Sequence, residues 1–189
     1  GLAGIATAVA VGVPLQTAAK AFENHIPPPG RTRIVPGLRG TTIIDDTYNS
    51  SPVASEEALK ILAEVPRTGR RIAVLADMLE LGSFSVVEHT RIGALVPTCA
   101  DILITSGVRS RDTAKGARDS GMHPEVVLET DRGADAASAI VSIMSEGDII
   151  LIKGSQSMRM ERVVKSLMLE PAKAKALLVR HDAEWLARP

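Results

Sequence analysis

The chain has 189 residues, enough for one domain of ordinary size and part of another, and its 45% hydrophobic content is enough for a packed core. A formal net charge of +0 argues against a broad basic surface for nucleic acid, and 2% aromatic residues are too few for base-stacking platforms. The single cysteine, Cys99, excludes an intramolecular disulfide framework. These properties favour a cytoplasmic globular protein.

The first fifty residues have too little apolar periodicity to close a core of their own. Residues 1–13 are nearly all apolar, but Pro14 cuts them short of the roughly 20 residues that span a membrane, so we predict no membrane insertion and a buried helix over residues 2–11. A second helix is predicted from Pro14 to about Asn24, before the Pro-rich run 27–29. Since the chain opens inside an apolar run, we expect residues 1–50 to be the end of a larger domain whose upstream part is missing.

From Ser51 onwards, strands alternate with helices. Ser51 suits the N-cap and Pro52 the first position of a helix, and Ser85 with Glu88 forms a capping-box pattern at the start of another. Helices are predicted over residues 52–65, 85–96, 110–120, 131–144 and 157–169. Strands are predicted over residues 33–35, 41–45, 71–76, 101–105, 125–128 and 148–153. This alternation predicts an α/β domain over residues 51–189, with a doubly wound, mostly parallel sheet. In the tail, Trp185 and Leu186 are predicted to pin residues 171–189 to the domain surface.

Polar residues that follow the strands indicate where a ligand would bind, because ligands of open parallel sheets collect at the carboxyl ends of the strands. Lys153-Gly154-Ser155 precedes a predicted helix, so Lys153 and backbone N–H groups could hold a carboxylate or phosphate there. The alternative is structural: Gly154 makes a tight turn, Ser155 or Ser157 caps the helix, and Lys153 is solvated. Neither the phosphate-loop pattern nor the dinucleotide fingerprint occurs, so no self-sufficient nucleotide site is visible.

A pair of carboxylates, Asp45 and Asp46, ends the strand before Ser51. Adjacent strand residues point to opposite faces, so only one of them can face a given ligand and the other serves a cap or turn. The carboxylate could bind a ribose diol and Arg31 a phosphate; turn chemistry and a surface ion pair are the alternative.

The histidines lack the spacing of metal ligands and are interpreted as surface or capping residues, so no metal site is predicted. They are His25, His89, His123 and His181.

Four runs in this order, Gly30-Arg31, residues 44–52, residues 75–82 and residues 153–161, resemble the Mur ligases. The resemblance implies an ATP-dependent amide ligase of peptidoglycan precursor synthesis. It would add D-alanyl-D-alanine to a UDP-N-acetylmuramoyl-tripeptide through an acyl phosphate. Residues 1–50 would end the central ATP-binding domain, and residues 51–189 would form the Rossmann-like C-terminal domain.

On this resemblance, one group of residues would face ATP. Arg31 would reach the nucleotide, and Asp46 would lie near the ribose with Tyr48 and Asn49 beside it. The family's Gly-Lys-Thr loop and magnesium ligands have no counterpart here, so ATP and Mg²⁺ would be held mostly by an upstream domain. We therefore expect the chain alone to be inactive as a ligase.

A second group would close over the incoming dipeptide: Lys153 and Ser155, with Asp77 and Glu80 as further candidates. The expected partners are the UDP-linked tripeptide and D-alanyl-D-alanine, for a monomeric protein that binds no nucleic acid. Two alternatives are open. One is another amide ligase of the superfamily, similar to folylpolyglutamate or cyanophycin synthetases; the other is a non-catalytic Rossmann-like module that binds a small anion.

Overall fold

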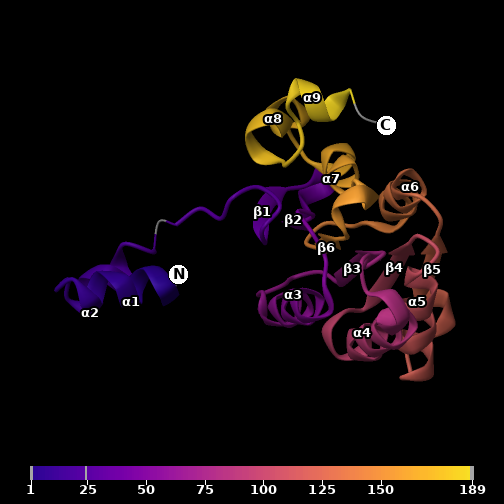
Figure 1. The fold of residues 1–189 in the computed structure, drawn as a ribbon. Coiled ribbons are helices and arrows are strands. Elements are labelled where there is room, and N and C mark those ends of the chain that lie inside the picture. Colours follow the sequence, from indigo (N-terminus) through magenta and orange to yellow (C-terminus); the bar gives the residue numbers. More distant parts are fainter. Residues whose placement is uncertain (1, 24, 188–189) are drawn as a thin grey trace.

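Six strands form one sheet in the computed structural model, which describes residues 2–23 and 25–187 (Figure 1). Their order is β1-β2-β6-β3-β4-β5; β1 is antiparallel to β2, and the other neighbours are parallel. The predicted mostly parallel α/β sheet is therefore confirmed. The strands are β1 (Arg33–Pro36), β2 (Thr42–Asp46), β3 (Arg71–Ala76), β4 (Ile102–Ser106), β5 (Val127–Thr130) and β6 (Ile149–Lys153).

Helices cover both faces of this sheet (Figure 1). The α-helices are α1 (Leu2–Ala10), α2 (Leu15–Lys20), α3 (Pro52–Glu64), α4 (Ser85–Cys99), α5 (Ser110–Asp119), α6 (Gly133–Ile143), α7 (Glu161–Leu167), α8 (Ala174–Leu177) and α9 (Ala183–Leu186). Short 3-10 turns are η1 (Leu38–Gly40), η2 (Gly82–Phe84), η3 (Pro124–Val126), η4 (Gln156–Met158) and η5 (Pro171–Lys173).

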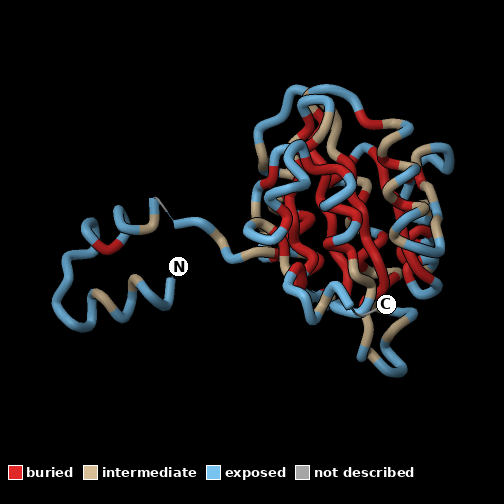
Figure 2. Tube along the Cα trace, turned by 90° about the horizontal axis from the view of Figure 1, so that it is seen from above, coloured by how far each residue is buried: buried red, intermediate tan, exposed pale blue. Residues whose placement is uncertain are grey.

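The core has two layers because side chains alternate along each strand. In β3, Ile72 and Val74 pack with α6 and α7, whereas Ala73 and Leu75 pack with α3, α4 and α5. Both sets are buried, which explains the uninterrupted apolar run of the strand. Figure 2 shows the buried residues concentrated in the sheet.

The N-terminal helices lie apart from the sheet, joined to it by an extended segment (Figures 1 and 2). The predicted helix over residues 2–11 is present as α1, but its expected burial is wrong, because α1 has no buried residue. The second helix ends at Lys20, and its expected end near Asn24 lies outside the described residues. The division of the chain at residue 50 stays a prediction; β1 and β2, which precede it, belong to the same sheet as the later strands.

Two helix starts differ in their capping. At α3 the prediction is confirmed, since Ser51 Oγ accepts a hydrogen bond from the Ala54 N–H at 3.4 Å. At α4 the capping-box prediction is wrong: Ser85 is already helical and the helix has no side-chain cap. The carboxylate of Glu88 instead pairs with Arg91 one turn later.

Three other predictions are corrected in the second half of the chain. The predicted helix 157–169 is interrupted after η4, because Arg159 adopts a left-handed φ of 53° and α7 begins only at Glu161. The predicted strand 125–128 is shifted, because Glu125 lies in η3. Leu186 does not pin the tail, since it is 56% exposed; Leu178, 3% exposed, is buried against the sheet instead.

Glycines bring α4 and α5 into close contact. A Cβ atom at Gly93 would lie 2.0 Å from the carbonyl oxygen of Thr113, and one at Gly116 would lie 2.2 Å from that of Thr90. Each helix thus presents a glycine to the backbone of the other.

Candidate functional site

Three loops meet at the carboxyl edge of the sheet, after β2, β3 and β6. The strands are parallel neighbours in the order β2-β6-β3, so their carboxyl ends lie side by side. The C-terminal segment, residues 171–187, also reaches this edge and brings Trp185 to it. Two cavities of about 520 Å³ and one of about 270 Å³ open among these elements.

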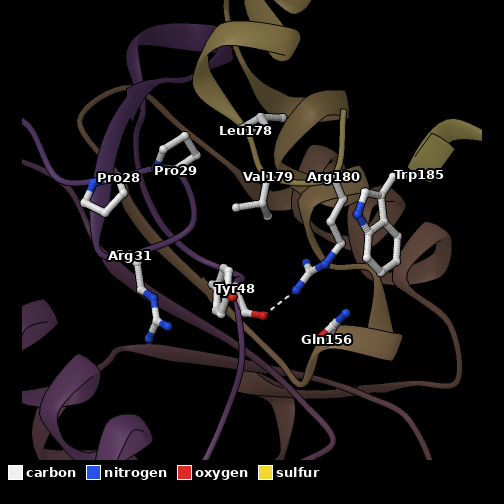
Figure 3. A pocket seen from close by; sticks show the side chains of 9 residues that line it. All are labelled: Pro28, Pro29, Arg31, Tyr48, Gln156, Leu178, Val179, Arg180 and Trp185. Atoms are coloured by element: carbon white, nitrogen blue, oxygen red, sulfur yellow. Dashed lines mark hydrogen bonds between the residues drawn. The ribbon is translucent and has the colours of Figure 1, made fainter. Parts of the chain in front are cut away.

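The first cavity, called here the Tyr48 cavity, lies between the β2 loop and the C-terminal segment (Figure 3). The guanidinium of Arg31 stacks over the Tyr48 ring, 4.1 Å from its centroid, so the pair forms a cation–π contact. Both side chains are exposed and available to a ligand. The cavity is lined by Pro28, Pro29, Arg31, Tyr48, Gln156, Leu178, Val179, Arg180 and Trp185.

The smallest cavity, called here the Asp46 cavity, contains a buried ion pair. Lys153 Nζ lies 2.6 Å from Asp46 Oδ2 and donates a second hydrogen bond to the Asn49 carbonyl at 2.9 Å. The other oxygen, Asp46 Oδ1, accepts from the Thr32 N–H at 3.0 Å. Arg31, Asp46 and Asn49 line this cavity together with Lys153. The alternative in which Lys153 is solvated is wrong, because the residue is 2% exposed.

Asp45 points away from Asp46 and makes the turn after β2. Its Oδ1 accepts from the Thr47 hydroxyl at 2.6 Å and the Thr47 N–H at 3.2 Å, and its Oδ2 accepts from the Gly30 N–H at 3.1 Å. This confirms that one carboxylate of the pair serves a turn. Burial raises the pKa of Asp45, against the opposing effect of these hydrogen bonds.

The raised pKa of Asp45 predicts how stability changes with pH. The folded chain binds the proton of the Asp45 carboxyl more tightly than the unfolded chain does. Protonation of Asp45 therefore stabilises the fold: this stabilisation is complete below the ordinary pKa of about 3.9 and is lost as the pH rises through the pKa of the folded chain. Asparagine does not titrate, so the Asp45→Asn variant should become more stable relative to the original chain as the pH rises. The expected gain in the free energy of unfolding is about 1.4 kcal/mol for each pH unit by which folding raises the pKa of Asp45. Urea unfolding from about pH 4 upward measures this difference; a difference that stays constant with pH would contradict it.

The side chains of Asp77 and Ser155 hold loops together. Asp77 Oδ1 accepts from the Ser110 N–H at the start of α5 at 2.8 Å, and the Ser155 hydroxyl accepts from the Leu79 N–H at 2.8 Å. The Ser155 N–H donates to the Asp77 carbonyl at 3.1 Å, which joins the loops after β6 and β3. Neither Ser155 nor Ser157 caps the following turn through its side chain.

The third cavity, called here the serine cavity, lies between these joined loops and the β2 loop. Glu80 is the one charged residue among those that line it, and its φ of 64° is left-handed. Gln156 and Trp185 line both this cavity and the Tyr48 cavity, so they form a wall common to the two. Its lining residues are Asn49, Ser50, Ser51, Leu79, Glu80, Leu81, Ser155, Gln156, Ser157 and Trp185.

Two of the histidines are not surface residues. His89 is fully buried and its Nε2 accepts from the Met78 N–H at 3.0 Å, while Nδ1 lies 2.8 Å from the Ser85 carbonyl, which assigns the proton to Nδ1. His181 is also buried, and burial followed by the nearby Lys165 lowers its pKa. His123 is a capping residue as predicted, accepting from the Glu125 N–H at 3.4 Å.

No role was assigned from the sequence to Gln156 and Glu161, although both lie in the run 153–161, and Arg180 was missed; the fold brings all three to the same edge. Arg180 is 8% exposed and pairs with the fully buried Glu161 at 3.1 Å. No spacing in the sequence links Arg180 to the β2 loop, because only the path of the C-terminal segment brings them together.

No group of three His, Cys, Asp or Glu side chains in residues 2–23 and 25–187 is placed to hold a metal ion. Within the same ranges, no helix has the length and apolar character needed to cross a bilayer.

Sequence similarity places the chain in a class of ligase domains. The sequence profile described as "Mur ligase, glutamate ligase domain" matches residues 30–156, and the chain belongs to the Mur ligase family. The UDP-N-acetylmuramoyl-tripeptide–D-alanyl-D-alanine ligase of Bacillus subtilis is 31% identical over 171 residues, covering 90% of this chain and 37% of the relative. The Escherichia coli protein of the same name is 28% identical, covering 88% and 35%.

Solved structures show the same fold. The MurF ligase of Thermotoga maritima in complex with ADP has a TM-score of 0.68 at 22% identity, covering 91% of this chain and 37% of that chain. MurF from Acinetobacter baumannii has a TM-score of 0.68 at 27% identity, covering 83% and 34%. The chain thus spans little more than a third of the length of these relatives.

Proposed function

We propose that this chain is part of an ATP-dependent ligase that adds D-alanyl-D-alanine to a UDP-N-acetylmuramoyl-tripeptide in peptidoglycan precursor synthesis. The observation that carries the proposal is that Arg31, Asp46 and Asn49 line one cavity at the carboxyl edge of the sheet. They do so in a chain whose relatives bear the name of that reaction. In this proposal the chain supplies one side of a nucleotide site and the side that receives the dipeptide.

The nucleotide side would consist of Arg31, Asp46, Tyr48 and Asn49. The exposed Arg31 guanidinium can bind phosphate oxygens, and its stacking on Tyr48 limits the directions in which it points. Asp46 accepts from Thr32 and Lys153, and a carboxylate has about four lone-pair sites, which leaves capacity for a ribose hydroxyl. ATP would supply the phosphoryl group that activates the acceptor carboxylate. No step is assigned to Mg²⁺, because the described residues contain no cluster of ligands that fits it.

The serine cavity is the proposed place of the dipeptide. The Glu80 carboxylate can pair with the ammonium group, and serine hydroxyls with the Gln156 amide can bind the peptide and its carboxylate. Ser155 belongs to this lining, whereas Lys153 and Asp77 are buried in contacts within the protein. In this proposal, Lys153 and Asp77 do not touch the substrate; they hold in place the loops that line the site.

The test is an assay of the full-length protein that contains this chain. We expect phosphate release from ATP that requires both the UDP-linked tripeptide and D-alanyl-D-alanine, with the ligated product detected by mass spectrometry. With L-glutamate in place of the dipeptide we expect no phosphate release, whereas a folylpolyglutamate-type ligase would use L-glutamate. The 189-residue chain alone serves as the control and is expected to show no ATP hydrolysis. A full-length protein that is inactive with these substrates would contradict the proposal.

A further inference from the structure

Arg180 reaches from the C-terminal segment into the loop that follows β2. Its Nη1 donates to the Thr47 carbonyl at 3.1 Å, and its Nη2 donates to the Tyr48 carbonyl (Figure 3). The guanidinium also lies 5.7 Å from the centroid of the Tyr48 ring and 5.7 Å from that of Trp185. One side chain therefore contacts the backbone and the ring of the residue on which Arg31 stacks.

Buried charge fixes the guanidinium in this place. Glu161, fully buried at the start of α7, pairs through Oε2 with Arg180 at 3.1 Å and through Oε1 with Arg159 at 2.6 Å. Arg159 in turn donates to the Trp185 carbonyl at 3.2 Å. Arg180 itself has a left-handed φ of 57°, a conformation that persists in a non-glycine residue only where its surroundings determine it.

We propose that Arg180 is a positioning residue for the nucleotide side of the site; this inference rests on the proposed function. By holding the Thr47 and Tyr48 carbonyls, Arg180 sets the direction of the Tyr48 ring, and the ring sets the direction of the Arg31 guanidinium at 4.1 Å. The planar fork of arginine is required, because two carbonyls and a carboxylate are bound in fixed directions, which a lysine ammonium does not reproduce.

The experiment measures steady-state kinetics of the full-length ligase with Arg180→Ala and Arg180→Lys. We expect the KM for ATP to rise about tenfold in both variants, equivalent to one charge-assisted hydrogen bond, while kcat changes about twofold or less. A merely structural role would instead lower the amount of active enzyme and leave KM unchanged. Arg180→Leu keeps apolar volume at this position and leaves Glu161 paired with Arg159 at 2.6 Å, so it provides a third variant if the alanine variant does not fold.

Arg70→Ala is the matched control. Arg70 also pairs with a buried carboxylate, that of Asp148 at 2.6 Å, but at the amino-terminal edge of the sheet. Its loss is expected to lower stability without raising the KM for ATP. If the full-length protein is an active ligase and the Arg180 variants leave its KM for ATP unchanged, the role of Arg180 is overturned and the proposed function is not. The same holds if Arg70→Ala raises the KM for ATP as much as the Arg180 variants do. If the full-length protein without substitutions shows no ATP-dependent ligation, the proposed function itself is overturned.

Discussion

Lys153→Ala is expected to lower the free energy of unfolding by about 3–5 kcal/mol, because removing one partner of a buried ion pair leaves the other charge uncompensated. Asp46 would keep its hydrogen bond from the Thr32 N–H but lose the ammonium 2.6 Å from its second oxygen. The Asn49 carbonyl would also lose its donor. Urea unfolding followed by circular dichroism measures the change.

Lys60→Ala is the control for this prediction. Lys60 also contacts carboxylates, Glu56 at 3.0 Å and Glu57 at 2.9 Å, but its side chain is 54% exposed. Exposed pairs contribute at most about 1 kcal/mol, so Lys60→Ala should change stability little. A loss at Lys153 as small as that at Lys60 would show that the buried pair stabilises nothing. Replacing both partners, Lys153→Met with Asp46→Asn, should recover part of the loss, because no charge is then left unpaired and the amide oxygen can still accept from the Thr32 N–H.

Gly93→Ala is the second substitution with a large expected effect. It should lower the free energy of unfolding, although alanine has the higher helix propensity. Alanine in place of glycine favours an exposed helix by about 1 kcal/mol. Here the new methyl group would lie 2.0 Å from the Thr113 carbonyl oxygen and 3.0 Å from the Ala117 nitrogen, both backbone atoms that cannot rotate away. Separation of α4 from α5 should therefore dominate, for a net loss of about 2 kcal/mol in thermal or urea unfolding.

Gly133→Ala tests whether the loss at Gly93 comes from backbone contact. At Gly133 the nearest atoms belong to the side chains of Val163, at 3.1 Å, and Met160, at 3.7 Å, which can adjust. We expect this substitution to be close to neutral. Equal stabilities for the two alanine variants would show that α4 and α5 tolerate separation at no cost.

Local patterns predicted most of the elements, for identifiable reasons. The run Arg71–Ala76 was predicted with its observed ends, because an apolar strand covered on both faces has no polar interruption. The start of α3 was predicted because Ser51 and Pro52 act within one turn. The prediction failed at α4 because Ser85 is already helical and its hydroxyl lies 3.4 Å from Nδ1 of His89, one turn later in the same helix. It failed at α7 because Arg159 adopts a left-handed φ and pairs with the buried Glu161.

The site was less accessible to sequence reasoning because distant segments form it. Asp46 and Lys153 were placed in two separate groups, one for the nucleotide and one for the dipeptide. The pairing of β2 with β6 makes them direct neighbours in the sheet and joins them in one ion pair. Alternation of strands and helices does not determine this order. Arg180 was missed for the same reason, since its partners Thr47 and Glu161 come from different elements.

The position of β6 between β2 and β3 has a consequence for synthesis on the ribosome. β2 and β3 emerge early, but each lacks its shared neighbour until residues 149–153 have been made. Parallel pairing of strands so distant in sequence is slow, and unpaired strand edges readily bind other chains. The nascent chain must therefore carry two incomplete halves of its sheet, and these can be joined only when the last strand of the sheet leaves the exit tunnel.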